Sequence, residues 1–329
     1  MPGAAMFELA ILDDYQNVAL SLADWDRIRD RVNITVIDRA LGADAAVALA
    51  PFDIVCLMRE RTPFPAMLFQ TLPKLKFMTL TGARSPSLDL DAATARGIVV
   101  SHTGYGRQSA TAELTWALIL AAARHLPTET AAMRAGRWQT TVGRVLAGGT
   151  LGLLGLGRLG GQVAAIGKAF GMEVQAWSQN LTEEKAAAAG ARLVDKETLF
   201  RTSDWISIHL VLSDRSRGLV GTEDLARMKP DAWLVNTSRG AIVDETALLA
   251  ALEAGTIGGA ALDVYAVEPL PADHPLRRSP RTVLTPHLGF VTEDSYRVFY
   301  RDTVEDVAAW LDRAPIRVMN PAALASDAR

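Results

Sequence analysis

The clearest chemical signal in the sequence is a short glycine-rich loop. The segment TLGLLGLGRLGGQVA places Gly155, Gly157 and Gly160 in the spacing Gly-x-Gly-x-x-Gly, with Arg158 and Leu159 between the last two. In such a loop the first glycine permits a tight turn, the second lets backbone approach a pyrophosphate, and the third allows close helix packing. Because an apolar strand precedes the loop and a helical pattern follows it, phosphates can sit on the helix's N-terminal amides. The pattern predicts a dinucleotide site, the alternative being a merely tight turn.

The cofactor side of this site lacks the usual acid. An NAD site generally offers a carboxylate to the adenosine ribose about 20 residues after the loop, but the next strand, Glu173–Trp177, ends in Ser178 and Gln179. A neutral hydroxyl would not repel the 2′-phosphate of NADP, yet no arginine follows at once to bind that phosphate. We therefore expect NAD or NADP as the cofactor, with the preference between them open. The alternative is that Ser178 only caps a loop and that other contacts hold NAD.

The position of this loop depends on the strands and helices that the rest of the sequence predicts. Short apolar runs alternate with amphipathic segments, which is the pattern of parallel strands with crossover helices. The first alternation has helices over Val18–Arg31 and Leu88–Arg96, and a long helix over Ser109–His125 should stop near Pro127. A second series of alternating strands and helices follows, and the pattern predicts a last helix over Glu293–Leu311. The predicted strands are Phe7–Leu12, Ile34–Ile37, Ile54–Met58, Phe77–Leu80, Ile98–Val100, Leu151–Leu154, Glu173–Trp177, Trp205–Leu210, Trp233–Asn236, Ala260–Val264 and Val283–Leu284. The fold class is α/β with doubly wound parallel sheets.

Composition limits the class of protein. A chain of 329 residues fits two domains with a cleft between them. A net charge of −3 with interspersed acids and bases predicts no nucleic-acid partner. The N-terminus lacks a basic region for a signal peptide, and the apolar stretches are too short to span a membrane, so we expect a soluble, cytoplasmic protein. Cys56 reads as a buried core thiol, and no residues have metal-ligand spacing, so we expect no metal.

Three further motifs follow the glycine loop in order: LVNTSRGAIVDETALLAAL, GAALDVYAVEPLP and VLTPHLG. Together with MRERT and LTGARSPSLDLDAATARGIVVSHTG upstream, they resemble the D-isomer-specific 2-hydroxyacid dehydrogenase family, which includes phosphoglycerate, glyoxylate and hydroxypyruvate reductases. The resemblance implies a flavodoxin-like substrate domain of residues 1–101 with 289–329 and an inserted Rossmann cofactor domain of residues 102–288. It also implies a homodimer, which can use the segment Leu126 to Leu146 with Trp138. Because the chain ends soon after its last helix, we expect no appended regulatory domain.

The resemblance assigns catalysis to Arg239, Glu268 and His287. Reduction of a 2-oxo acid adds a hydride to the carbonyl carbon while the oxygen takes a proton. A histidine suits this proton transfer because its ordinary pKa lies near neutral pH. Glu268 would hold the other ring nitrogen and favour the imidazolium. Arg239 keeps its proton, and its fork can bridge the substrate carboxylate and the polarised carbonyl oxygen.

The same resemblance implies further cofactor contacts. Asp263 matches an acid that contacts the nicotinamide carboxamide. The family has a proline two residues after the histidine at His209, whereas this chain has Val211, so the shape of that loop is open. The remaining predicted cofactor contacts are Thr111, Gln179, Thr237 and Ser238.

The predicted substrate loop departs most from the family pattern. Thr81–Ser85 keeps one glycine of the usual two and adds a charge. Gly82 and Ala83 can present backbone amides to a substrate carboxylate, while Arg84 can either bind a second anionic group or point to solvent. Arg59 best matches the family's substrate-binding arginine, with Arg61 next to it.

Two other functions remain open on these residues. A dinucleotide-sensing protein resembling the C-terminal-binding-protein corepressors would keep the same motifs with little turnover. A formate dehydrogenase relative is less consistent, since by resemblance that branch has glutamine at the position of Glu268.

Overall fold

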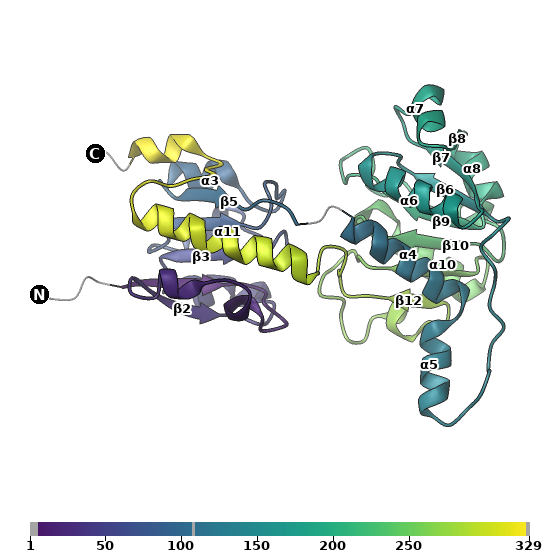
Figure 1. Ribbon diagram of the computed structural model, residues 1–329, viewed down its shortest axis with the longest axis horizontal. Helices are drawn as coiled ribbons and strands as arrows, with labels where there is room; N and C mark the ends of the chain where they lie inside the picture. The colour runs from purple at the N-terminus through teal and green to yellow at the C-terminus, as the bar shows by residue number, and fades with distance from the viewer. Residues whose placement is uncertain (1–5, 107–108, 327–329) are drawn as a thin grey trace, which may run out of the picture. The chain divides into compact units, whose positions relative to one another are not determined.

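The computed structural model describes residues 6–106 and 109–326, and the chain forms two compact units (Figure 1). One unit comprises Met1–Gln108 with Thr292–Arg329, and the other is the continuous stretch Ser109–Val291. The boundaries expected near residues 102 and 288 fall a few positions earlier than these. His102 still pairs with Leu80 in the first sheet, so the chain leaves that unit only after this strand is complete.

The discontinuous unit contains a five-stranded, all-parallel sheet. Its strand order is β2-β1-β3-β4-β5, which is the flavodoxin-like order 2-1-3-4-5 and confirms the predicted fold class. All five predicted strands form here. Their bounds are β1 (Phe7–Ile11), β2 (Val32–Val36), β3 (Ile54–Leu57), β4 (Phe77–Leu80) and β5 (Val99–His102).

In this unit the predicted helix over Glu293–Leu311 forms, whereas the one predicted over Val18–Arg31 does not. The chain returns at its C-terminal end as α11 (Glu293–Leu311), whose first turn is capped by Thr292 accepting the amide of Ser295 at 3.2 Å. The helix predicted over Val18–Arg31 does not form, and two short 3₁₀ turns occupy the segment. The Asp14 carboxylate accepts the amides of Val18 and Ala19, which offers the backbone an alternative to helical bonds. The other helices are α1 (Ala45–Leu49), α2 (Ala66–Gln70) and α3 (Leu90–Ala95).

The second unit contains a seven-stranded, all-parallel sheet of order β12-β11-β10-β9-β6-β7-β8. If β6 is numbered as strand 1 and the sheet is read from β8, the order is the Rossmann order 3-2-1-4-5-6, and β12 adds a seventh strand at the far edge. The direction of winding reverses between β6 and β9. The two-residue strand β8 is too short for a sequence pattern to reveal. The strands are β6 (Thr150–Leu154), β7 (Glu173–Trp177), β8 (Arg192–Leu193), β9 (Trp205–Ile208), β10 (Trp233–Asn236), β11 (Gly259–Leu262) and β12 (Thr282–Leu284).

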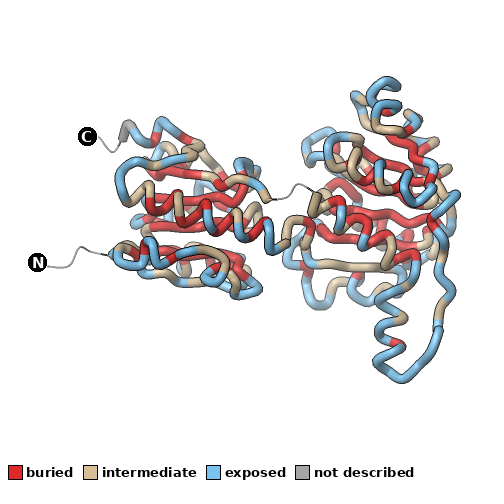
Figure 2. The backbone as a smooth tube through the Cα atoms, in the orientation of Figure 1, coloured by how far each residue is buried: buried red, intermediate tan, exposed pale blue. Residues whose placement is uncertain are grey.

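Helices cover both faces of this sheet, so its central strands are buried on both sides, whereas the edge strands β8 and β12 are partly exposed (Figure 2). On one face α4 (Ala110–Ala123) and α6 (Arg158–Ala169) pack on a cluster that includes Trp116, Leu151 and Val235. On the other face lies a cluster that includes Leu154, Ile206 and Leu234. The helices of that second face are α8 (Lys196–Thr202), α9 (Thr222–Arg227) and α10 (Glu245–Ala254), and α7 (Glu183–Ala188) precedes β8.

An arm stands away from the body of this unit (Figure 1). The predicted stop near Pro127 is a break rather than an end: His125 adopts φ 51°, and a second helix, α5 (Leu126–Arg134), begins directly after it. Proline is accommodated because the first helical turn needs no donor there. The following stretch is held to α5 by Glu129, which accepts bonds from Thr140 and Thr141. The arm leaves several apolar side chains in water.

Candidate active site

The glycine loop joins β6 to α6, and its glycines differ in what surrounds them. Gly155 has φ 99°, and a Cβ there would lie 2.6 Å from the carbonyl oxygen of His209. A Cβ on Gly160 would lie 2.2 Å from the carbonyl oxygen of Gly155. A Cβ on Gly157 would meet no atom within 4 Å. Two glycines are therefore required by the turn and its packing, whereas the third borders open space.

That open space lies at the N-terminus of α6. Gly157 is the N-cap residue of this 12-residue helix, and its first turn contains no acidic side chain. Arg158 is exposed at the same end. The N-terminal amides of a helix and the positive end of its dipole attract anions, and a glycine without a side chain lets an anion come close to the backbone. The residues present therefore fit the pyrophosphate of a dinucleotide.

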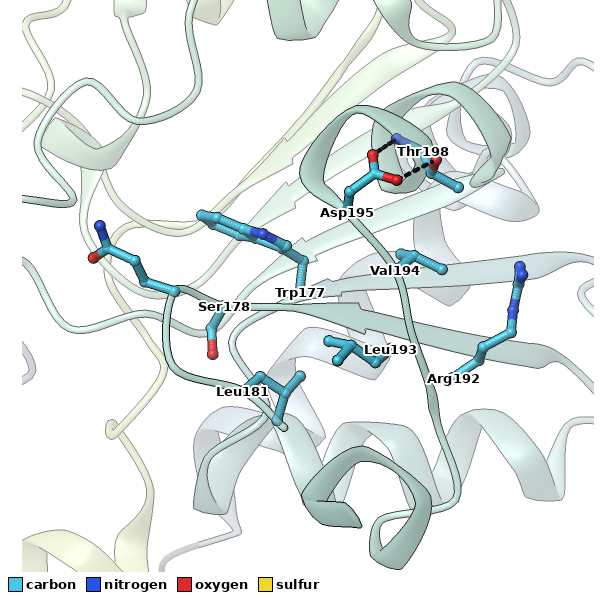
Figure 3. A pocket seen from close by; sticks show the side chains of 9 residues that line it. Trp177, Ser178, Leu181, Arg192, Leu193, Val194, Asp195 and Thr198 are labelled. Carbon is cyan, nitrogen blue, oxygen red and sulfur yellow. Dashed lines mark hydrogen bonds between the residues drawn. The ribbon is translucent and has the colours of Figure 1, made fainter. Parts of the chain in front are cut away.

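The strand next to β6 ends in a polar cavity of about 590 Å³ (Figure 3). Ser178 and Gln179 line it directly after β7, and Trp177 contributes to its apolar part together with Leu181, Leu193 and Val194. One carboxylate, that of Asp195, also lines the cavity, but both of its oxygens accept bonds from Thr198 in the first turn of α8. Arg192 lines it too and donates to the Gln175 side chain at 3.0 Å. Neither charged group lies directly after β7, where a ribose-binding acid usually stands.

His209 follows the strand on the other side of β6. Its Nε2 lies 2.9 Å from the Ser207 hydroxyl, while its Nδ1 is buried without a hydrogen-bond partner in the described part of the chain. Burial lowers the pKa of His209 to about 4, so the ring is neutral at neutral pH. Val211, where the family pattern has proline, is 73% exposed. His209 thus borders the glycine loop as an uncharged side chain.

The three predicted catalytic residues follow three neighbouring strands. Arg239 comes shortly after β10, Glu268 after β11 and His287 after β12, and these strands are adjacent in the sheet. Because the carboxyl ends of parallel strands meet at one edge, the loops converge. A Cβ on Gly240 would lie 2.0 Å from the carbonyl carbon of Tyr265, so only glycine lets the first two loops approach this closely.

Glu268 and His287 form a direct pair. Oε2 of Glu268 lies 2.5 Å from Nδ1 of His287, and Oε1 accepts the amide of Tyr265 at 2.9 Å. Although partial burial raises the pKa of Glu268, the hydrogen bond and charge of His287 lower it more, with help from the charge of Arg239, and the net shift is downward. Glu268 is thus ionised at neutral pH. Because Nδ1 of His287 is bonded to Glu268, Nε2 is the ring nitrogen that points away from this carboxylate.

The loop that carries His287 is fastened by Asp263, which is fully buried. Its carboxylate accepts bonds from the Thr285 hydroxyl and from the amides of Leu288 and Gly289, at 2.6, 2.7 and 2.9 Å respectively. Its carbonyl oxygen accepts the amide of His287, whose φ of 55° is uncommon for a residue with a side chain. These contacts hold the histidine in place, and the nicotinamide contact expected for Asp263 stays a prediction.

Asn236 holds Arg239 and was not singled out from the sequence. Its Oδ1 accepts the amide of Ser238 at 3.0 Å, and its Nδ2 donates to the carbonyl oxygen of Arg239 at 2.9 Å. The side chain therefore spans the turn that aims the guanidinium. Its position as the last residue of β10, inside the motif NTSRG, is the signal that could have revealed it.

Three hydroxyl groups tie the first turns of α4 to this edge of the sheet, and a fourth joins the ends of β10 and β9. Thr111 donates to the carbonyl oxygen of Gly289, and the hydroxyls of Thr115 and Thr237 lie 2.9 Å apart. Ser238 donates to the carbonyl oxygen of Ile208 at 2.7 Å. The structure thus brings the predicted cofactor residues Thr111, Thr237 and Ser238 into the same region as the loop of His287.

The predicted substrate residues Arg59, Gly82 and Ala83 lie in the flavodoxin-like unit. Arg59 follows β3, and its Nη1 donates to the carbonyl oxygen of Thr81 at 3.3 Å. The amides of Gly82 and Ala83, expected to face a substrate, already have acceptors: the Thr103 hydroxyl at 3.0 Å and the Tyr105 hydroxyl at 3.1 Å.

Metal ligation and membrane crossing are considered for the described ranges, residues 6–106 and 109–326. No group of three or more His, Cys, Asp or Glu side chains is placed there to hold a metal ion. No helix within those ranges is both long enough and apolar enough to cross a bilayer.

The fold and site define a two-domain protein with a Rossmann dinucleotide-binding unit and a histidine–carboxylate pair. Residues 116–289 match the family model for the D-isomer specific 2-hydroxyacid dehydrogenase, NAD binding domain. The chain is 39% identical to glyoxylate reductase from Aeropyrum pernix, covering 87% of this chain and 84% of that protein. It is 35% identical to D-3-phosphoglycerate dehydrogenase from Synechocystis sp., covering 88% of this chain and 54% of that protein.

The structure of phosphoglycerate oxidoreductase from Vibrio cholerae O395 is similar as well, with a TM-score of 0.88, 38% identity, and coverage of 94% of this chain and all of that one. The chain spans about half the length of the phosphoglycerate dehydrogenases it matches. It belongs to the D-isomer specific 2-hydroxyacid dehydrogenase family, which confirms the family expected from its motifs.

Proposed function

We propose that this protein is an NAD(P)-dependent oxidoreductase that interconverts a small 2-oxo acid and the corresponding D-2-hydroxy acid. The observation that carries the proposal is the 2.5 Å pair of Glu268 and His287, on the same sheet edge as a glycine loop that fits a pyrophosphate. A bound nicotinamide would supply or accept the hydride. The residues of the chain would bind the acid and move the proton.

The roles of the three residues follow from their chemistry. In reduction, Nε2 of His287 donates a proton to the carbonyl oxygen of the substrate, and in oxidation it takes that proton back. The ionised Glu268 fixes the ring orientation and stabilises the imidazolium. Arg239, aimed by Asn236, binds the carboxylate of the substrate and stabilises the charge that develops on the carbonyl oxygen.

The cofactor would lie along the edge from the glycine loop to His287. The amides at the start of α6 and the exposed Arg158 would hold the pyrophosphate, with Leu159 beside them. Ser178 and Gln179 would meet the adenosine ribose without excluding a 2′-phosphate, so NAD and NADP are both proposed. The nicotinamide end would meet Thr111, His209, Thr237, Ser238 and Asp263.

The substrate class is proposed from the relatives and from the first unit. The similar proteins carry the names glyoxylate reductase and D-3-phosphoglycerate dehydrogenase, whose substrates are small carboxylic acids. Arg59 and the amide of Ala83 are the carboxylate contacts proposed in this unit, while the amide of Gly82, also expected to face a substrate, donates to the Thr103 hydroxyl.

We propose a homodimer that uses the arm. Trp138, Val142 and Val145 are 74, 90 and 83% exposed, and apolar side chains gathered on a projecting segment favour burial against a second copy. Sedimentation velocity would show a loss of dimer in Trp138→Ser, and an unchanged mass would contradict this role.

A cytoplasmic location is also proposed, supported by the free, buried thiol of Cys56. Fractionation of the cells that make the protein would test this location.

The test is turnover of NADH and NADPH with glyoxylate, hydroxypyruvate, pyruvate and 2-oxoglutarate. The wild type should reduce at least one acid, and His287→Ala should lower kcat by about 100- to 10,000-fold, the usual contribution of acid–base catalysis. The affinity for NADH should stay within about twofold, because the mutation removes no phosphate contact. His274→Ala is the matched control, since His274 forms another histidine–carboxylate pair, with Glu245 at 3.1 Å.

Two outcomes would contradict the proposal. Tight binding of NADH with no turnover of any acid would favour the dinucleotide sensor instead. Equal losses in His287→Ala and His274→Ala would show that folding, rather than proton transfer, is affected.

A further inference from the structure

Three loops at the ends of neighbouring strands meet in the flavodoxin-like unit. Arg59 follows β3, Thr81–Ala83 follow β4, and Thr103–Tyr105 follow β5, and these three strands are adjacent. The amide of Arg59 donates to the Thr81 hydroxyl at 2.7 Å, which fastens the first two loops to each other. The convergence places an arginine, two amides and a tyrosine at one end of the sheet.

Tyr105 is in contact with both groups expected to bind a carboxylate. Its hydroxyl accepts the amide of Ala83 at 3.1 Å, and the guanidinium carbon of Arg59 lies 5.5 Å from its ring centre. Gly82 makes this packing feasible: it has φ 83°, and a Cβ there would lie 2.1 Å from Nη1 of Arg59 and 2.8 Å from Cε1 of Tyr105. Any side chain at Gly82 would separate the tyrosine from the arginine.

We propose that Tyr105 is a specificity-determining residue whose hydroxyl competes with the substrate carboxylate for the amide of Ala83. This inference rests on the proposed function, in which Arg59 and the amide of Ala83 bind that carboxylate. A carboxylate makes stronger hydrogen bonds than a neutral phenol oxygen, so it can displace the hydroxyl. An uncharged group gains little by the exchange. The arrangement therefore favours acids over neutral carbonyl compounds.

Tyr105 is placed to move aside. Its side chain is 50% exposed, and glycines precede and follow it. The neighbouring contacts do not depend on it: the amide of Gly82 donates to Thr103, and the amide of Gly104 donates to Asp302 on α11. The ring can turn into solvent while both loops keep these bonds.

The test is Tyr105→Phe, which removes the hydroxyl and keeps the ring beside Arg59. With the 2-oxo acid that the wild type reduces fastest, KM should fall about fivefold, which is about 1 kcal/mol and equals the net contribution of a typical hydrogen bond. The value of kcat should stay within about twofold, because His287 and Arg239 are untouched. Calorimetric titration of the NADH-bound protein with oxalate should show the same gain in affinity.

Tyr15→Phe is the matched control. Tyr15 is 40% exposed, its ring centre lies 4.9 Å from the guanidinium carbon of Arg61, and it belongs to the loop after β1 in the same unit. Its KM should equal that of the wild type. An unchanged or higher KM in Tyr105→Phe, or an equal fall in both variants, overturns the role of Tyr105. A wild type that neither reduces any acid nor binds oxalate overturns the proposed function and this inference together.

Discussion

Replacing Gly157 with alanine should separate cofactor binding from folding. The new methyl group would meet no protein atom within 4 Å, and the φ of −77° suits alanine. The unfolding free energy should therefore change by less than about 1 kcal/mol, because the entropy that alanine removes from the unfolded chain is offset by its weaker preference for the N-cap position. Cofactor affinity should fall, because the methyl group occupies the space through which the pyrophosphate reaches the amides of α6.

The size of the loss follows from the bonds at the helix end. Hydrogen bonds to a charged group contribute about 1.5–3 kcal/mol each. Displacing the pyrophosphate from one such amide should raise the Kd for NADH by about 10- to 100-fold. The affinity for the 2-oxo acid should be unchanged, because its proposed contacts do not include this loop.

Gly160→Ala is the comparison that should behave in the opposite way. Its Cβ would lie 2.2 Å from the carbonyl oxygen of Gly155 and 3.1 Å from the carbonyl carbon, and Gly155 itself packs against the backbone of His209. Neither backbone segment can yield cheaply, so we expect a loss of about 1–3 kcal/mol of stability, typical of overpacking.

Both variants can be measured in two experiments: urea unfolding followed by tryptophan fluorescence, and titration with NADH followed by its own fluorescence. If Gly157→Ala binds NADH as tightly as the wild type, the pyrophosphate does not lie against this loop. If Gly157→Ala is instead strongly destabilised, the open space beside Gly157 is not there.

Two further predictions concern the cofactor end of the second unit. Ser178→Asp should shift preference toward NADH by at least about tenfold in kcat/KM, because a carboxylate directly after β7 repels the 2′-phosphate of NADPH, and an unchanged NADPH/NADH ratio would refute this placement. Burial lowers the pKa of His209 to about 4 from an unfolded value of about 6.5, so the unfolded state binds more protons between these values and stability should fall by up to about 3 kcal/mol as pH drops from about 6.5 to 4. His209→Gln should lose that part of the pH dependence in urea unfolding, and an identical pH slope in both proteins would show that other groups cause it.

The elements predicted well from the sequence have local causes. Most central strands are apolar runs that a sequence pattern detects, because helices cover both faces of the second sheet and apolar clusters line the first. The last helix begins and ends as expected because Thr292 caps it and its apolar positions recur at helical spacing. The glycine loop could be recognised because Gly155 and Gly160 are required by the turn and its packing, and Gly157 leaves space for a phosphate.

The elements predicted poorly depend on contacts that the local pattern does not contain. The Asp14 carboxylate accepts the amides of Val18 and Ala19 at the start of the segment where a helix was expected, and β8 forms by pairing with Gln175 and Ala176. In the sequence Asn236 is the last residue of a strand, and only the folded turn shows that its side-chain amide bridges Ser238 and Arg239.

The sequence by itself determined the chemistry available to this protein: a glycine loop for a dinucleotide, no acid after the second strand, and an arginine, a glutamate and a histidine in three ordered motifs. These are properties of residue type and short spacing. Only the tertiary structure decided which of these groups act together. Strands adjacent in the sheet bring Glu268 and His287 to 2.5 Å, and the same parallel arrangement places Tyr105 against the amide of Ala83. Such contacts arise because parallel strands end at one edge, whatever their separation along the chain.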